Sequence, residues 1–219
     1  GRVQRLFAIE RDPQLCAGLR KRFSGSSKGS EGARISVIEA DFLKYDLKGL
    51  PRPLKVIGNL PYYISSPILV RLLEHHQQFT DLFFTLQWEL GQRLVAKAST
   101  KDYSALSCLV QFYTQPQLLF KIKNTCFQPI PKVDSCFVHL SILPRAPFVV
   151  QNKKLFFDMI RMAFQQRRKI IVNSLSGLVA KDRLQGILDF LSISPRLRAE
   201  DLTLKNYADI SNALTGQGG

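Results

Sequence analysis

Residues 55–63 read Lys-Val-Ile-Gly-Asn-Leu-Pro-Tyr-Tyr. The two β-branched residues after the lysine favour a buried strand, which ends at the polar Asn59. Pro61 disfavours helical backbone at Leu60 and so predicts an extended segment beyond the strand tip. In open α/β sheets, the crevice outside the carboxyl ends of the strands is the usual place for a ligand. The stretch therefore predicts an α/β fold with a ligand site at the end of this strand.

The same stretch offers groups that suit an amino-bearing base. The side-chain carbonyl of Asn59 and the backbone carbonyl of Leu60 can both accept hydrogen bonds from one NH2 group. Tyr62 can place a flat face against a planar ring. Asn and Pro are also ordinary turn residues, so a simple strand-to-loop turn is the alternative for these four residues taken alone.

Two earlier predicted strands also end in acids. Residues 3–9 form a strand that runs into Glu10, and the strand at 35–38 is followed by Asp41. The first carboxylate can accept hydrogen bonds from ribose hydroxyls and the second from the exocyclic amine of an adenine. A Glu at a strand edge and an Asx turn are the alternatives for each acid alone. Because successive β-α units of one sheet end at the same edge, we expect Glu10, Asp41 and Asn59 to line one crevice.

The composition points to a globular protein with a polyanionic partner. The chain has 219 residues, 45% hydrophobic content and a formal net charge of +14. A positive potential of this size attracts nucleic acid, and basic residues that only solubilise the surface are the weaker explanation. The sequence shows no apolar run of about 18 residues. We therefore expect an intracellular protein without a membrane span.

Cysteine and histidine usage predicts neither disulfides nor a metal site. The four cysteines have no C-x-x-C spacing and stand in apolar patterns, which is typical of reduced, buried thiols. The three histidines lie far from any pair of cysteines that could serve as ligands. We expect a reducing compartment and no metal.

The last seventy residues change character. After Pro144-Arg145-Ala146-Pro147 the pattern becomes helical, which places a domain boundary near residue 148. A single helix is predicted over residues 154–175, with Arg161, Gln165 and Arg168 on its polar face. The overall charge favours phosphate contacts for this stripe over an ordinary solvated face.

The chain resembles one family, the ribosomal small-subunit RNA adenine N6,N6-dimethyltransferases, over nearly its whole length. The stretches that carry the resemblance are Ala-Ile-Glu-Arg-Asp-Pro at 8–13, Glu-Ala-Asp-Phe at 39–42, Gly-Asn-Leu-Pro-Tyr at 58–62, Phe-Gln-Pro-Ile-Pro-Lys-Val-Asp-Ser at 127–135 and Ala-Phe-Gln-Gln-Arg-Arg-Lys at 163–169. The Asn-Leu-Pro-Tyr motif gains its specificity from this combination.

The resemblance implies an α/β, Rossmann-like domain with a doubly wound, mostly parallel sheet over residues 1–147 and a small all-helical RNA-binding domain over 148–219. It implies S-adenosylmethionine (SAM) as methyl donor, held by Glu10, Asp41, Phe42 and Asn59. The target amine and base would meet Asn59, Leu60, Pro61, Tyr62 and Phe127, with Tyr62 and Phe127 as stacking walls. RNA phosphates would meet Lys132, Arg161, Arg168 and Lys169.

One departure from the family concerns the start of the chain. The family has, before the strand that ends in Glu10, a first strand with a Gly-rich loop around the methionine end of SAM, and this sequence begins after it. We therefore expect the chain to lack its first β-α unit, to bind SAM weakly and to be inactive by itself.

The function expected from the resemblance is dimethylation of adenine N6 in small-subunit ribosomal RNA by a cytoplasmic monomer, with the mitochondrial matrix or a plastid as the alternative location. Two other functions stay open on the sequence alone. One is a catalytically silent RNA-binding protein of the same fold, acting in ribosome assembly or mitochondrial transcription. The other is N6-adenine methylation of large-subunit RNA or DNA.

Overall fold

A computed structural model describes residues 4–23 and 34–216. It divides the chain into two compact units, Gly1–Pro51 and Arg52–Gly219, which we call the first and second units and describe separately. The Ser/Gly-rich stretch at 24–32, which the sequence predicts to be a loop, lies outside the described residues.

The first unit is a small parallel β-α-β arrangement. It contains β1 (Arg5–Glu10), α1 (Pro13–Phe23), β2 (Arg34–Glu39) and the short 3-10 helix η1 (Leu47–Gly49). Pro13 opens α1, because its fixed φ and missing N–H suit the first position of a helix. Strands β1 and β2 pair in parallel from Arg5↔Arg34 to Glu10↔Glu39. The buried Cys16 ties the helix to the strand, since its Sγ lies 3.4 Å from the Glu10 carbonyl.

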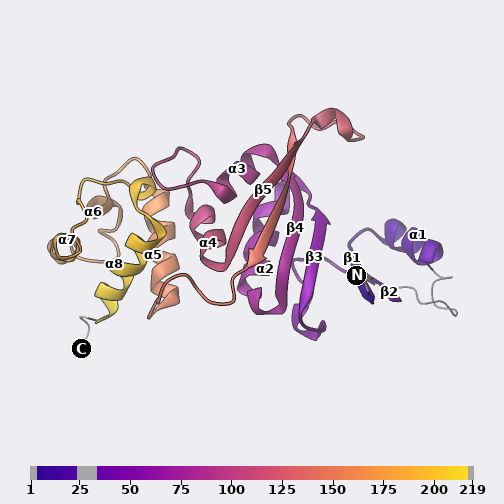
Figure 1. Cartoon of the computed structure of the whole chain (residues 1–219), viewed down its shortest axis with the longest axis horizontal. Helices are drawn as coiled ribbons and strands as arrows, with labels where there is room; N and C mark the ends of the chain where they lie inside the picture. The colour runs from indigo at the N-terminus through magenta and orange to yellow at the C-terminus, as the bar shows by residue number, and fades with distance from the viewer. Residues whose placement is uncertain (1–3, 24–33, 217–219) are drawn as a thin grey trace. The chain divides into compact units, whose positions relative to one another are not determined.

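The second unit is built on a four-stranded mixed sheet (Figure 1). Its strands are β3 (Leu54–Asn59), β4 (Phe79–Gln87), β5 (Thr114–Ile122) and β6 (Ser135–Ile142), in the spatial order β3-β4-β6-β5. Strands β3 and β4 are parallel, and β6 runs antiparallel to both β4 and β5. The Asn-Leu-Pro-Tyr segment begins at the carboxyl end of β3, where a ligand is expected.

The expectation that three consecutive strands form one continuous sheet is wrong. Among the strands that the structure describes, β1 and β2 form a sheet of their own, and β3 pairs only with β4. The strand that ends in Glu10 and the strand that precedes Asp41 belong to the first unit, and the strand that ends in Asn59 belongs to the second.

Three helices follow the strands of the second sheet: α2 (Ser65–Glu74), α3 (Trp88–Val95) and α4 (Ala105–Tyr113). Leu69, Leu72 and Leu73 of α2 are fully buried, as one apolar face of an amphipathic helix requires. Helix α4 begins at a capping box in which the Ser104 hydroxyl accepts from the Ser107 N–H at 3.3 Å.

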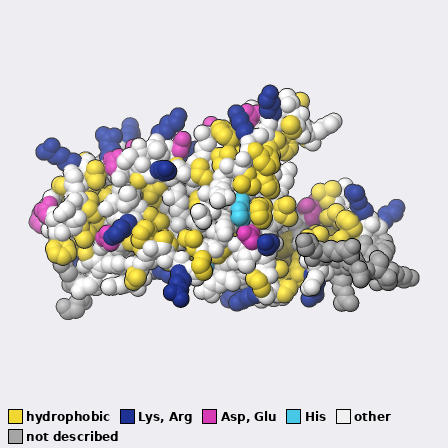
Figure 2. All heavy atoms as spheres, in the orientation of Figure 1, with side chains coloured by type: hydrophobic (Ala, Val, Ile, Leu, Met, Phe, Trp, Pro, Cys, Tyr) yellow, Lys and Arg dark blue, Asp and Glu magenta, His cyan; other side chains and the backbone are white. Residues whose placement is uncertain are grey.

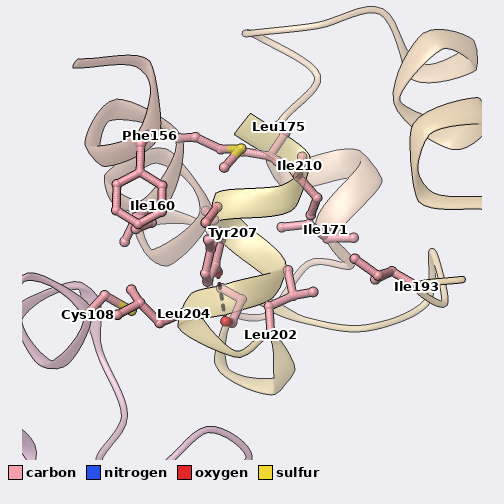
Figure 3. Packing of buried hydrophobic residues seen from close by; sticks show 14 of the residues in the cluster. Cys108, Phe156, Ile160, Ile171, Leu175, Ile193, Leu202, Leu204, Tyr207 and Ile210 are labelled. Carbon is pink, nitrogen blue, oxygen red and sulfur yellow. Dashed lines mark hydrogen bonds between the residues drawn. The ribbon is translucent and has the colours of Figure 1, made fainter. Parts of the chain in front are cut away.

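The carboxyl-terminal part is helical, as predicted, and has its own apolar core. It contains α5 (Lys153–Gln165), α6 (Ile171–Ser174), α7 (Lys181–Phe190) and α8 (Leu204–Gly216). Figure 3 shows Phe156, Ile160 and Tyr207 in this core, where the Tyr207 hydroxyl donates to the Ala199 carbonyl at 2.7 Å. The core continues into α4 through Cys108, so the predicted boundary near residue 148 falls inside the second unit.

The prediction of one helix over residues 154–175 is wrong. Helix α5 ends at Gln165, and a turn over 166–169 precedes the short α6. The cause is a tertiary contact that local periodicity does not show, because Arg167 donates to the Glu200 carboxylate and, at 2.6 Å, to the Lys101 carbonyl. Arg168 therefore does not continue the helical face that carries Arg161.

A membrane-spanning helix and a metal site can be examined only in the residues that the structure describes. Within residues 4–23 and 34–216, no helix is both long and apolar enough to span a bilayer. The same residues contain no cluster of three or more metal-ligating side chains. All four cysteines are free, but Cys126 is exposed, which corrects the expectation that every thiol is buried.

Candidate methyl-transfer site and nucleic-acid interface

The carboxyl ends of β1 and β2 lie side by side in the first unit. Glu10 is in register with Glu39, and the Ala40 N–H donates to the Glu10 carbonyl at 2.9 Å. Asp41, two residues after β2 ends, therefore stands next to the tip of β1. Glu10 and Asp41, two of the three residues expected to line one crevice, therefore follow adjacent strand ends in the first unit.

The Glu10 carboxylate is fixed by its own loop. Oε1 accepts from the backbone N–H groups of Arg11 at 2.7 Å and Asp12 at 2.8 Å. Oε2 has no hydrogen-bond partner within the described part of the chain. A carboxylate held by one oxygen presents the other to a ligand, which suits a pair of ribose hydroxyls.

Asp41 forms the Asx turn that was its alternative interpretation. Its Oδ1 accepts from the Leu43 N–H at 2.9 Å, and its carbonyl accepts from the N–H groups of Lys44 and Tyr45. Oδ2 and the N–H of the half-buried Phe42 have no partner among the residues described. The turn thus orients one acceptor and one donor, the pair that the amine and a ring nitrogen of an adenine require.

In the second unit, β3 ends next to two carbonyl groups, the side-chain carbonyl of Asn59 and the backbone carbonyl of Leu60. The Leu60 N–H donates to the Thr85 carbonyl at 3.2 Å, which anchors the segment to β4. The Asn59 side chain and the Leu60 carbonyl have no hydrogen-bond partner in the described residues, and Asn59 is exposed. The Pro61 carbonyl, in contrast, accepts from Ile64 N–H at 3.1 Å and Ser65 Oγ at 3.0 Å. The loop is therefore held at Pro61 and open at Asn59 and Leu60.

Tyr62 opens the short 3-10 helix η2 (Tyr62–Ile64) and is tethered from a distant part of the sequence. Its hydroxyl lies 2.6 Å from Oγ of Ser135, the first residue of β6. Ser135 is fully buried, whereas the next aromatic, Tyr63, is 81% exposed. Tyr62 is thus a half-buried ring with a fixed tip, as a stacking wall requires.

Phe127 lies in the loop at the tip of the β5–β6 hairpin, which projects beyond the other strands in Figure 1. It follows the 3-10 helix η4 (Asn124–Cys126), and its N–H donates to the Asn124 carbonyl at 3.2 Å. The half-buried Phe127 belongs to none of the aromatic pairs found among the described residues. This is a state between full burial in a core and full exposure, which suits a wall of an open pocket.

Asp134 holds that loop in place. Its Oδ1 accepts from the Asn124 N–H at 3.0 Å, and its Oδ2 lies 2.8 Å from Lys121 Nζ. The bond to Lys121, and after it the Asn124 N–H, lowers the pKa of the Asp134 carboxyl below its ordinary value. The carboxylate is therefore the form that the loop geometry stabilises.

The predicted RNA-binding residues fall into two groups. Lys132, Arg168 and Lys169 are exposed and make no ion pair with any residue that the structure describes. Arg161 is also exposed but pairs with Asp158, which Lys154 contacts at 2.7 Å on its other side. The first group is available to phosphates, and Arg161 is partly neutralised.

The sequence interpretation missed the roles of Asp134 and Ser135. Both belong to the quoted stretch 127–135, but their partners Asn124, Lys121 and Tyr62 are not marked by any local pattern. It also missed Arg167, whose bonds to Glu200 and Lys101 set the turn that presents Arg168 and Lys169.

Comparison with known protein families gives one match over almost the whole chain. A family model described as ribosomal RNA adenine dimethylase matches residues 1–216. Among curated proteins, the ribosomal RNA small subunit methyltransferase A of Acinetobacter baylyi is 37% identical over 217 residues, covering 98% of this chain and 76% of that protein. The protein of the same name from Moorella thermoacetica is 36% identical, covering 95% and 75%.

Solved structures share the fold. A dimethyladenosine transferase from Plasmodium falciparum superposes with a TM-score of 0.81 at 21% identity, covering 98% of this chain and 83% of that one. The 23S rRNA methyltransferase ErmE superposes with a TM-score of 0.69 at 23% identity, covering 96% and 82%. Both confirm a Rossmann-like methyltransferase fold.

Proposed function

The chain belongs to the ribosomal RNA adenine dimethylase family, and we propose that the tip of β3, Asn59-Leu60-Pro61-Tyr62, is where it binds the adenine that it methylates. It is an rRNA adenine methyltransferase of the small-subunit type that uses SAM as methyl donor.

One observation carries this assignment: two neutral acceptors stand unused beside a tethered aromatic ring. The Asn59 side chain and the Leu60 carbonyl have no partner among the described residues, while the neighbouring Leu60 N–H and Pro61 carbonyl are both engaged. An exocyclic NH2 group has two N–H donors, so it can satisfy both acceptors at once. The Tyr62 ring supplies the flat surface on which the base would stack.

The residue types fit the chemistry of an aromatic amine. The N6 lone pair of adenine is delocalised into the ring, so the amine is a poor nucleophile. Acceptors on both N–H bonds favour a pyramidal nitrogen whose lone pair points at the methyl group. With SAM bound, the N–C bond would form as the S–CH3 bond breaks, which leaves the donor as a neutral thioether, and the cationic nitrogen would then lose its proton to water. A neutral Asn59 therefore suffices, and positioning supplies most of the rate enhancement.

Glu10 and Asp41 would hold the adenosine half of SAM. Glu10 Oε2 would accept from the ribose hydroxyls, and Asp41 Oδ2 would accept from the adenine amine while the Phe42 N–H donates to a ring nitrogen. Support comes from the adjacent strand ends and from the oxygen that each carboxylate leaves without a partner in the described residues. SAM would supply the methyl group.

A basic ridge in the second unit would hold the RNA backbone. Hydrogen bonds bring three segments together. The Ser99 N–H donates to the Glu200 carbonyl at 2.7 Å, the Arg167 side chain donates to the Glu200 carboxylate and the Lys101 carbonyl, and Ile170 pairs with Arg198. Figure 2 shows Lys and Arg side chains gathered along this helical part. The exposed basic residues of the three segments, which we call the basic ridge, are Lys97, Lys101, Arg168, Lys169, Arg196 and Arg198.

None of the ridge residues has an ion pair among the described residues, and Glu200, one of the acids beside them, is already paired with Arg167. Phosphates would therefore meet uncompensated charge. We place the protein, as a monomer without a metal, on the small ribosomal subunit in the cytoplasm, where the four free thiols would stay reduced.

The test of this function is methylation of an unmodified small ribosomal subunit by the full-length protein with SAM, followed by mapping of the modified nucleotides. We expect N6-methylated adenines in small-subunit RNA. Modification of large-subunit RNA or DNA alone, or RNA binding without any methyl transfer, would replace this assignment by one of the two alternatives.

A further inference from the structure

Two consecutive residues hold both predicted walls of the base pocket. Ser135 contacts the hydroxyl of Tyr62, and Asp134 contacts the loop that carries Phe127. Tyr62 and Ser135 are 73 residues apart in the sequence. The start of β6 is therefore the point where the two aromatic segments are fixed relative to one another.

The hydrogen bond between Ser135 and Tyr62 joins a fully buried residue to a half-buried one. Ser135 is 0% exposed, and its Oγ lies 2.6 Å from the Tyr62 hydroxyl, while the Tyr62 ring is only half-buried. A buried hydroxyl that loses its partner is penalised, so the folded chain keeps this bond formed. The bond fixes the ring at its far end as well as at its Cα.

Asp134 makes three contacts, two with residues of the β5–β6 hairpin and one with the first residue of α3. Its carboxylate binds Asn124 N–H and Lys121, and its backbone carbonyl accepts from the Trp88 N–H at 3.0 Å. Asn124 in turn donates from Nδ2 to the Pro131 carbonyl at 3.1 Å, across the loop. These bonds close the loop at its base and tie it to the end of β4.

We propose that Asp134 and Ser135 are paired positioning residues for methyl transfer, which set the orientation of Tyr62 and of the Phe127 loop around the target adenine. The inference rests on the proposed function of the β3 tip, because it concerns the walls of that same pocket. Neither side chain needs to touch the base. They act through the two aromatic residues, and the effect appears in turnover rather than in RNA docking, since the basic ridge is a separate surface.

A fixed ring matters because the reaction depends on alignment. A target nitrogen that is displaced by about 1 Å from the line of attack can lose on the order of 100-fold in rate. An untethered Tyr62 ring keeps its apolar surface but samples more orientations. Loss of the tether should therefore cost less than loss of the ring itself.

The first test is a double-mutant cycle on Ser135 and Tyr62 in the full-length protein. Ser135→Ala and Tyr62→Phe should each lower kcat about 3- to 10-fold, the worth of one hydrogen bond, with KM for the small ribosomal subunit unchanged. The double variant should lose no more than either single variant, because one bond is removed in all three. Losses that multiply, or a reduced affinity for the subunit at unchanged kcat, would overturn the inference.

The two single variants disturb the fold in different ways. Tyr62→Phe leaves the buried Ser135 hydroxyl without its partner, whereas Ser135→Ala removes that hydroxyl altogether. A loss of kcat that both variants share, with melting measured alongside, therefore reports on the tether. Ser174→Ala is the matched control, since Ser174 is a buried serine whose hydroxyl bonds to Ile171 in the helical part. The control should change melting at most and leave kcat as in the wild type.

The second cycle pairs Asp134 with Phe127. Asp134→Ala should lower kcat by a similar factor. Asp134→Asn should recover part of the lost kcat, because it keeps an acceptor for the Asn124 N–H. Adding Asp134→Ala to Phe127→Ala should cause no further loss of kcat.

Asn59→Ala distinguishes a failure of the positioning role from a failure of the proposed site. If Asn59→Ala is inactive while Ser135→Ala, Tyr62→Phe and Asp134→Ala keep wild-type kcat, only the positioning role is overturned. If Asn59→Ala also keeps full turnover, the site itself is wrong.

Discussion

At the scale of single residues, the aromatic pair decides whether the β3 tip is a base pocket. Tyr62 and Phe127 are both half-buried, which distinguishes them from core aromatics such as Phe84 and Phe112, which are 0% exposed. An enzyme that modifies a base must offset the cost of unstacking it, and stacking on aromatic side chains does so. The half-buried state leaves ring surface for that purpose.

Replacing either wall should therefore reduce activity without unfolding the protein. Tyr62→Ala and Phe127→Ala should each lower turnover by an amount equivalent to about 1 to 3 kcal/mol of stacking. A core phenylalanine would instead cost about 3 to 5 kcal/mol of stability. Methyl transfer and thermal melting, measured together in the full-length protein with Phe112→Ala as the core control, separate the two roles. A variant that keeps full turnover is not a wall.

A second residue-scale prediction concerns the pH dependence of stability. Asp81 on β4 contacts His139 Nε2 at 2.8 Å and Lys55 Nζ at 3.1 Å, and the His139 bond is the main reason why the pKa of the Asp81 carboxyl falls to about 2. Because this folded-state pKa lies below the unfolded value of roughly 4, the contribution is present above pH 4 and is lost as the pH falls toward 2.

Asp81→Asn should lower the free energy of unfolding at pH 7 by about 1 to 2 kcal/mol. Denaturant unfolding of both proteins over the acid range checks this, and the gap between them should close from pH 4 downward. A gap that stays constant to pH 2 would show that Asp81 does not contribute through its charge.

At the scale of elements, the packing of α3 on β6 depends on a glycine. A Cβ added at the buried Gly91 would lie 2.2 Å from Cys136 Sγ, far inside van der Waals contact. Gly91→Ala should therefore destabilise the protein by roughly 1 to 3 kcal/mol, as overpacking of a filled site does. Cys136→Ala in the same chain removes the clashing sulfur, so the double variant should recover part of the loss. Thermal melting of the three variants is the measurement, and additive losses would exclude the clash as the cause.

The turn between α5 and α6 is predicted to bind RNA phosphates. Because Arg167 is engaged by Glu200 and Lys101, the turn presents Arg168 and Lys169 without a protein counter-ion among the described residues. The variant with both residues changed to Ala should weaken RNA binding and reduce the slope of log affinity against log salt by about 1 to 2 units.

Lys205→Ala is the matched control for that experiment, since Lys205 is exposed but paired with Asp209 at 2.7 Å. Its salt slope should stay close to that of the wild type. Equal slopes for the ridge variant and the control would return Arg168 and Lys169 to an ordinary solvated surface.

At the scale of the whole molecule, patterns of neighbouring residues predicted many helices and strands. The features that these patterns did not predict are caused by contacts between residues far apart in the sequence. The strands that end at Glu10 and before Asp41 were predicted correctly, because the residues that form and end a strand are adjacent in the sequence. The break after Gln165 was missed because its cause, Glu200, lies far along the chain. The tether between Tyr62 and Ser135 was missed for the same reason, since no periodicity links residues from a 3-10 helix and a distant strand.

The most direct test of the central claim is single-turnover methyl transfer by full-length Asn59→Ala to an unmodified small ribosomal subunit, with SAM affinity, subunit affinity and melting measured alongside. If the Asn59 and Leu60 carbonyls align the adenine amine, the rate of transfer should fall by about 100-fold or more while the subunit affinity and the melting temperature stay as in the wild type. A variant that transfers methyl groups at the wild-type rate would contradict the assignment of the β3 tip as the site of the reaction.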